Sequence, residues 1–373
     1  MNKRLESLDA LRGFDLILLV VFEEFLWKLK PAVNASWFDT LMLNFTHKDW
    51  QGFSFWDLVM PLFMFMSGVT IPFSLAKYRT HSNRRSVYLR LVRRFILLWL
   101  LGMVCQGNLL GLDPQRIYLF SNTLQAIAVG YLFTAIIFLN TRIGSQVAIA
   151  VILLLAYWGA MEWITFDGYG GGDYTPKRNL AEIIDRVVLG RFRDGAVMVD
   201  GAVVFAEHYN YTWILSSLNF VVTVMTGLFA GTIIKSTQSQ RKKLLLLFGI
   251  GVAMVAVGWL MDDIQPVVKR IWTSSMVLVS SGYCFLLTWL FYYWIDCRGH
   301  CRRLTFLKIY GMNSITAYVV SLVINFSSVS HSILHGLEPY TGAYYPAIIA
   351  LSNAAIVFVI LLLMYRNKIF LRV

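Results

Sequence analysis

The sequence predicts an all-α fold, a polytopic integral membrane helical bundle of about ten transmembrane helices. Its composition supports this in two ways. Of the 373 residues, 57% are apolar and only 14% are charged, whereas soluble domains are about 45–50% apolar and about 25% charged. So few charges could not cover a water-facing surface of this size. Lipid must therefore replace water around most of the chain.

Apolar runs of roughly 20 residues, the length needed to cross a bilayer core of about 30 Å, recur along the chain. The expected spans are 8–29, 54–76, 92–112, 117–140, 144–166, 212–234, 243–261, 272–295, 304–325 and 344–365. The long connection 167–211 is Gly-rich at its start and then amphipathic around Leu180 to Leu189, which predicts a lid with a short surface helix. Neither an internal repeat nor a soluble domain is evident, so we expect a single transmembrane domain over residues 1–373.

The net charge of +12 comes from Lys and Arg residues that lie in short clusters between the apolar runs. The densest clusters are Lys77 to Arg94, Lys235 to Lys243, Arg298 to Arg303 and Arg366 to Arg372. They fall on one side of the membrane when the spans are counted, and positive loops stay in the cytoplasm. We therefore expect both termini in the cytoplasm, loops 30–53 and 167–211 outside, and the inner (plasma) membrane as the location. No basic face with interleaved aromatic residues points to a nucleic-acid partner.

The four cysteines do not predict a metal site. Cys105 and Cys284 lie inside apolar runs, while Cys297 and Cys301 flank a basic turn. A metal site needs a second ligand pair at suitable spacing, and none is evident. We expect free thiols in a reducing cytoplasm and no metal.

Ionisable side chains are costly inside a membrane span and usually face a polar interior. Asp9, Arg12 and Asp15 are spaced three apart in the first span, so they share one helical face. They form either an ion-pair network at the end of the helix or part of a site. Glu23 and Glu24 follow in the same span, and we expect at least one of them to face a cavity.

His47 lies just before the second span, and Asp57 lies one turn into it. Histidine is a natural proton acceptor because its ordinary pKa is close to neutral. A buried carboxylate such as Asp57 needs a bonding partner. From spacing alone His47 is either an interfacial or capping residue or a catalytic base.

Several stretches are similar to one family. RLESLDALRGFD, from Arg4 to Asp15, resembles the start of the heparan-α-glucosaminide N-acetyltransferase family of transmembrane acyltransferases. HKDWQG, from His47, followed by WDLVMPLFMFMSG, from Trp56, is similar to that family's most distinctive block. Further matches follow in order: Arg116 with NTLQAIAVGY from Asn122, NLAEIIDR from Asn179, KRIWT from Lys269 and GMNS from Gly311. The resemblance covers almost the whole chain.

The resemblance implies an enzyme that moves acetyl from acetyl-CoA, its co-substrate, to the amine of a glucosamine-type sugar or glycan acceptor. The position matching His47 is the family's active-site histidine. It would act as general base or as acetyl carrier, with Glu23 or Asp57 fixing its tautomer. The remaining residues expected to bind sugar or CoA are Asp9, Arg12, Trp50, Asn122, Gln125, Lys269, Trp272 and Asn313. Lipid is the expected surrounding, and a homodimer is one assembly compatible with such a protein.

Two departures leave the choice of sugar open. Animal members carry Asn where Glu23 aligns, and they have an additional luminal N-terminal domain that we do not expect here. A transmembrane O-acyltransferase of envelope polysaccharide also fits the block around His47, although the order of the other motifs favours N-acetylation. A transporter is the third interpretation. Transporters often show internal repeats and helices broken by Gly or Pro. This sequence shows no internal repeat and has little Pro within the expected spans, so a transporter is disfavoured.

Overall fold

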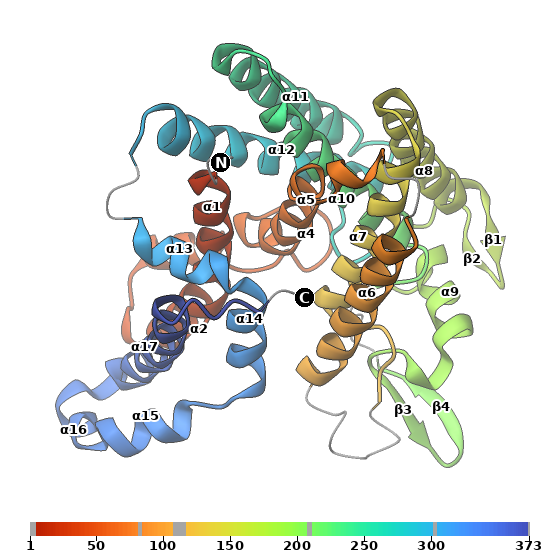
Figure 1. The fold of residues 1–373 in the computed structure, drawn as a ribbon. Coiled ribbons are helices and arrows are strands. Elements are labelled where there is room, and N and C mark those ends of the chain that lie inside the picture. The colour runs from red at the N-terminus through yellow and green to blue at the C-terminus, as the bar shows by residue number, and fades with distance from the viewer. Residues whose placement is uncertain (1–4, 81–83, 107–116, 207–210, 301–303, 372–373) are drawn as a thin grey trace. The chain divides into compact units, whose positions relative to one another are not determined.

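The computed structural model describes residues 5–80, 84–106, 117–206, 211–300 and 304–371. Nearly all of the regular structure is helical, and the strands of the described residues form two short hairpins (Figure 1). The chain divides into two compact units. The first unit comprises Met1–His47, Ser54–Val59 and Leu287–Val373, and the second comprises Lys48–Phe53 and Met60–Leu286.

The first unit is built from helices at both ends of the sequence. They are α1 (Glu6–Ile17), α2 (Glu23–Leu29), α3 (Ser36–Met42), α13 (Thr305–Met312), α14 (Ser314–Val323), α15 (Ser327–Leu334), α16 (Glu338–Thr341) and α17 (Tyr345–Arg366). A π-helical segment, Leu18–Phe22, joins α1 to α2 without a break. Glycines let α1 and α13 approach closely, as small residues do between membrane helices. A Cβ at Gly13 would lie 1.8 Å from the carbonyl oxygen of Leu307, and one at Gly311 would lie 1.9 Å from that of Asp9.

The expected span 304–325 is not a single straight helix. The structure has two helices there, α13 and α14, bent by 76° relative to each other. The break falls at Asn313, whose backbone is non-helical at φ −120° and ψ 40°. The Asn313 side chain donates a hydrogen bond of 3.2 Å to the carbonyl oxygen of Ile369. This bond fastens the bend to the segment that follows α17.

The second unit holds the middle of the chain. Its helices are α4 (Val59–Val69), α5 (Ile71–Leu75), α6 (Arg85–Cys105), α7 (Thr123–Asn140), α8 (Ile143–Trp163), α9 (Leu180–Leu189), α10 (Ser217–Lys235), α11 (Gln240–Leu260) and most of α12 (Ser274–Phe291). The first residue of α4 and the end of α12, from Leu287, belong to the first unit. Its hairpins pair β1 (Thr165–Phe166) with β2 (Tyr169–Gly170) and β3 (Ala196–Val199) with β4 (Ala202–Phe205). The predicted short helix in 167–211 is confirmed by α9, although most of its residues are buried and not at the surface. The hairpin β3–β4 in the same connection was not anticipated.

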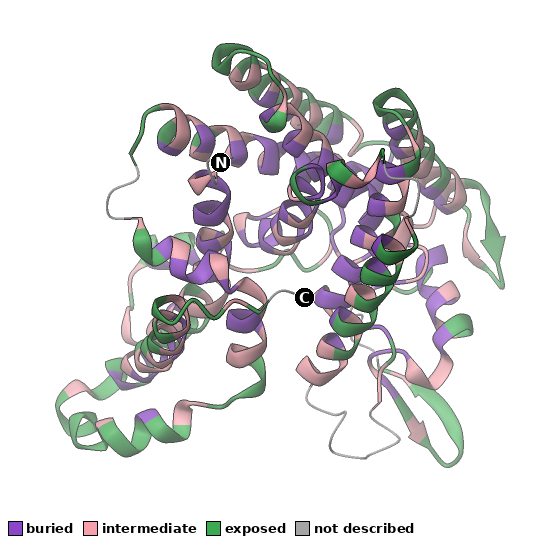
Figure 2. Cartoon of the chain, in the orientation of Figure 1, coloured by how far each residue is buried: buried purple, intermediate pink, exposed green. Residues whose placement is uncertain are grey.

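Burial separates the long helices of this unit into two kinds (Figure 2). Within the most apolar stretch of α10, 72% of the residues are buried, compared with 17% in α8 and in α11. α7 and α10 therefore form the core. α8 and α11 expose long apolar surfaces, which a protein surrounded by water does not tolerate. These surfaces identify the sides that face lipid.

Seven helices of the described chain are long and apolar enough to cross a membrane, and the bent pair α13–α14 makes an eighth if it counts as one span. The protein is thus an all-α polytopic membrane bundle, as predicted. The other two expected spans, 8–29 and 92–112, correspond to α1–α2 and to α6. Both carry several charged residues, and the end of the second lies outside the described residues. The total of about ten stays a prediction.

Candidate functional site

His47 and Asp57 form a hydrogen-bonded pair in the first unit. Nδ1 of His47 lies 2.8 Å from Oδ1 of Asp57. The histidine side chain is 43% exposed, whereas the aspartate side chain is 1% exposed. A carboxylate on Nδ1 favours the tautomer that carries its proton there, so Nε2 keeps a lone pair for accepting a proton or attacking a carbonyl. The pair has the base-and-orienter geometry of acyl-transfer enzymes.

Ser54 fixes the aspartate of this pair. The other carboxylate oxygen of Asp57, Oδ2, accepts hydrogen bonds from the Ser54 backbone N–H at 3.0 Å and from its hydroxyl at 2.9 Å. Together the two residues form a capping box at the start of the helical turn Phe55–Leu58. Both oxygens of the buried carboxylate are therefore satisfied. Sequence reasoning missed Ser54, although a Ser three residues before an acidic residue at a helix start is the pattern of this box.

Glu23, the other proposed partner of His47, lines a cavity of about 600 Å³ in the first unit. We call this cavity the hollow. The polar side chains that line it are Glu23, Glu24, Ser321, Asn325, Ser327 and Asn353. The expectation that at least one of the two glutamates faces a cavity is confirmed. A pairing of Glu23 with His47 stays a prediction.

Asp9, Arg12 and Asn313 also belong to the first unit. Asp9 is buried in α1 and Arg12 is half-buried one turn later. Asn313 is buried at the bend between α13 and α14. Its amide donates to the backbone of Ile369, which is a structural role. A binding role for these three residues stays a prediction.

Trp50, Lys269 and Trp272 lie in the second unit. The Trp50 indole donates to the carbonyl oxygen of Tyr174 at 2.9 Å. Trp272 has a left-handed φ of 52°, which is rare for a bulky residue and persists only where its surroundings fix it. Its indole donates to the Thr223 hydroxyl at 3.1 Å, and its carbonyl oxygen accepts from the Asn219 amide at 2.7 Å. Such strain clusters at functional sites, and the buried Lys269 is three residues away.

Asn122 and Gln125 act together at the start of α7. The Asn122 side chain accepts from the Leu124 backbone N–H at 2.9 Å. The side-chain oxygen Oε1 of Gln125 accepts from the backbone N–H of Ser121 and of Asn122. Its side-chain amide nitrogen donates to the backbone carbonyl oxygen of Leu119. Both side chains thus cap the helix. Their proposed contact with substrate stays a prediction.

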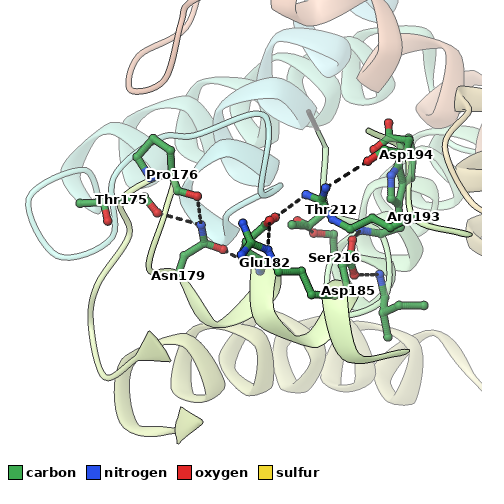
Figure 3. Close-up of polar contacts among 12 residues, drawn as sticks. Thr175, Pro176, Asn179, Glu182, Asp185, Arg193, Asp194, Thr212 and Ser216 are labelled. Carbon is green, nitrogen blue, oxygen red and sulfur yellow. Dashed lines mark hydrogen bonds and ion pairs between the residues drawn. The ribbon is translucent and has the colours of Figure 1, made fainter. Parts of the chain in front are cut away.

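A buried polar network holds the connection 167–211 in the second unit (Figure 3). Asn179 caps α9 by accepting from the Glu182 backbone N–H at 2.9 Å. Glu182 accepts from Arg186 at 2.7 Å and from Arg193 at 2.5 Å. Its neighbour on the same helix face, Asp185, accepts from the backbone N–H groups of Trp213 and Ile214 at 2.7 and 2.9 Å. The network ties α9 to the segment that leads into α10.

Asp185 is the titratable group of that network. Burial raises its pKa to about 7, and the two backbone N–H donors and Arg193 oppose the rise. None of Glu182, Asp185 and Arg193 was among the expected site residues. The signal in the sequence was the pair of acidic residues three apart on an amphipathic helix, which places both on one face.

Comparison with known proteins adds a relationship to these observations. Residues 4–108 match a family described as "Domain of unknown function (DUF5009)". The heparan-alpha-glucosaminide N-acetyltransferase of Homo sapiens is 26% identical over 368 residues, covering 85% of this chain and 52% of the relative. That of Mus musculus is 24% identical, covering 85% and 53%. The chain spans about half the length of the curated relatives it matches. These alignments support a family-level relationship between this chain and the heparan-α-glucosaminide N-acetyltransferases.

Proposed function

We propose that this protein is a transmembrane acetyltransferase that moves acetyl from acetyl-CoA to the amine of a glucosamine-type sugar, with His47 at the centre of the reaction. The observation that carries the proposal is the relay of Ser54, Asp57 and His47. A buried, fully bonded carboxylate orients a half-exposed imidazole through its Nδ1 atom. The relatives' names supply the substrate class.

The chemistry needs such an imidazole. An amino sugar arrives as an ammonium ion and must lose a proton before its nitrogen can attack the thioester carbonyl. Nε2 of His47 accepts that proton, and Asp57 stabilises the resulting imidazolium. As the tetrahedral intermediate collapses, the C–S bond breaks, the nitrogen releases its second proton to water, and the thiolate of CoA takes up the proton held by His47. The products are the N-acetyl sugar and free CoA.

A two-step route uses the same atoms. Nε2 attacks the thioester first, the C–S bond breaks, and acetyl is carried on the imidazole. The sugar amine then attacks this acetyl group, and the imidazole leaves. The two routes differ in whether CoA is released before the sugar reacts.

The direct test is acetyl-CoA turnover by the purified protein with a glucosaminide, with the matching hydroxyl-only glucoside, and with neither. We expect continuous CoA release only with the amino sugar, and its loss in His47→Ala. Release with the glucoside would instead identify an O-acyltransferase. Full activity of His47→Ala would remove this residue from the mechanism. The proposal includes the plasma membrane as location, with both termini in the cytoplasm.

A further inference from the structure

The hollow of the first unit carries an inference about the acceptor. Its volume of about 600 Å³ lies within the range of roughly 300–1,000 Å³ that is usual for small-molecule sites. Its walls come from the segment that joins α1 to α2, from α14, from the turn after it, and from α17. Its lining combines two carboxylates with amides and hydroxyls on helices that are otherwise apolar.

The π-helical segment Leu18–Phe22 aims the two carboxylates. A π-turn takes up more residues than an α-turn, so the residues after it are rotated relative to a continuous α-helix. Glu23 and Glu24 follow directly and line the hollow. Carboxylates in a membrane span are costly unless they meet a polar cavity. π-Helical turns occur frequently at functional sites.

A second irregular segment also lines the hollow. α14 ends at Val323, and Ile324, Asn325 and Phe326 have no regular structure before α15 begins. All three line the hollow. Backbone without regular hydrogen bonds is tolerated near membrane depth where it is buried in protein or lines a water-filled cavity. The lining of the hollow thus combines irregular backbone with polar side chains.

The wall of the hollow also supports the His47 pair. Leu19 lines the hollow and packs against the cluster of Leu18, Trp56 and Val59. Trp56 directly precedes Asp57 in the capped turn. The π-helical segment thus contacts both the hollow and the helical turn that carries Asp57.

We propose that the hollow is the acceptor subsite, in which Glu23 and Glu24 select an amino sugar over a neutral sugar of the same shape. This inference rests on the proposed function. The carboxylates bind the ammonium group, because charge-assisted hydrogen bonds exceed neutral ones in strength. Asn325, Asn353 and the two serines offer partners to the ring hydroxyls. A hydroxyl-only sugar brings no cation to the carboxylates and loses this contribution.

The test moves the charge from one wall to the other. In Glu24→Gln we expect the KM for a glucosaminide to rise about tenfold, the effect of losing one modest interaction, with kcat within twofold. The double variant Glu24→Gln/Asn353→Asp should recover much of the loss. It restores a carboxylate to the hollow, and the new side chain can still accept from the Ser330 hydroxyl, as Asn353 does at 2.7 Å. Glu338→Gln, an exposed glutamate of α16 outside the hollow, is the matched control.

A measurement of glucosamine binding tests this inference separately from the proposed function. The His47→Ala variant should bind glucosamine by calorimetry without turning it over, and adding Glu24→Gln should weaken that binding about tenfold. A KM for Glu24→Gln equal to that of Glu338→Gln overturns the assignment of the hollow, and so does a double variant no better than the single one. Failure of the proposed function would show separately, as an active His47→Ala enzyme or as no turnover by the wild type.

Discussion

Nδ1 of His47 lies 2.8 Å from Oδ1 of Asp57, and the two side chains differ sharply in exposure, at 43% and 1%. The carboxylate is fixed inside the protein while the imidazole reaches outward from it. Because Asp57 is already bonded to Ser54 through its other oxygen, it holds one orientation. The hydrogen bond to Asp57 therefore fixes both the orientation of the His47 ring and its tautomer.

The first prediction concerns Asp57→Asn. The amide can donate to Nδ1 and so favours the tautomer with the proton on Nε2, where it blocks acceptance of a proton. We expect kcat to fall about 10²- to 10⁴-fold while the protein remains folded. Asp39→Asn, an exposed aspartate of α3, is the control and should leave kcat unchanged. Equal kcat values in the two variants would show that Asp57 does not orient His47.

The second prediction concerns Ser54→Ala. It removes the hydroxyl that donates to Asp57 but leaves the backbone N–H bond in place. Loss of an N-cap side chain costs about 1 kcal/mol of stability. We expect a lower melting temperature in detergent and a fall in kcat smaller than that of Asp57→Asn. A larger fall would place Ser54 itself in the reaction.

The third prediction concerns the contact of α1 with α13. Gly13→Ala would place a Cβ 1.8 Å from a backbone oxygen, which cannot move without displacing α13. We expect destabilisation of about 3 kcal/mol, measured by thermal unfolding and by the yield of monodisperse protein. Gly249→Ala in α11, where no atom lies within 4 Å of the new Cβ, should be neutral or slightly stabilising. The same loss in both variants would argue against the close packing.

The fourth prediction concerns pH and Asp185. The folded-state pKa of about 7 lies above the ordinary value for aspartate of about 3.9. Between these values the folded state holds a proton that the unfolded state releases, so this group makes stability fall as pH rises from about 4 to about 7. In Asp185→Asn, melting temperatures across this range should decline less than in the wild type. Asp167→Asn, in an exposed turn, should keep the wild-type profile.

The fifth prediction concerns topology. In a background without native cysteines, Ser239→Cys should resist an impermeant thiol reagent in intact cells, because the loop before α11 is expected in the cytoplasm. Asp200→Cys, in the turn between β3 and β4, should react. Strong labelling of the Ser239→Cys variant in intact cells would reverse the proposed orientation.

The sequence was informative where a signal is local. Asp57 follows His47 by ten residues with a helix start between them, so their pairing could be anticipated. Apolar runs predicted the helices that are long enough to span, and the amphipathic pattern predicted α9. Each of these signals depends on neighbouring residues only.

The remaining features depend on contacts between distant segments. Asn313 is one polar residue in an apolar run, and no neighbouring residue predicts the bend between α13 and α14. The hydrogen bond from its amide at that bend goes to the backbone of Ile369, which is distant in the sequence. Leu18–Phe22 has the composition of an ordinary α-helix, so its π-helical geometry gives no sequence signal. The hollow is formed by side chains as far apart in the sequence as Glu23 and Asn353, which no local pattern joins.

The π-helical segment also makes the first helix tolerant of one change in the length of the chain. A π-turn corresponds to an α-helix with one inserted residue, so deleting a single residue such as Val21 would restore regular α-geometry. Because the π-turn takes up the extra residue locally, the residues after the deletion would keep nearly the same direction around the helix axis, and Glu23 and Glu24 would still line the hollow. The same deletion in a regular α-helix would turn every later residue by about 100°. A relative one residue shorter in this segment would thus present the same face to its substrate from an uninterrupted α-helix.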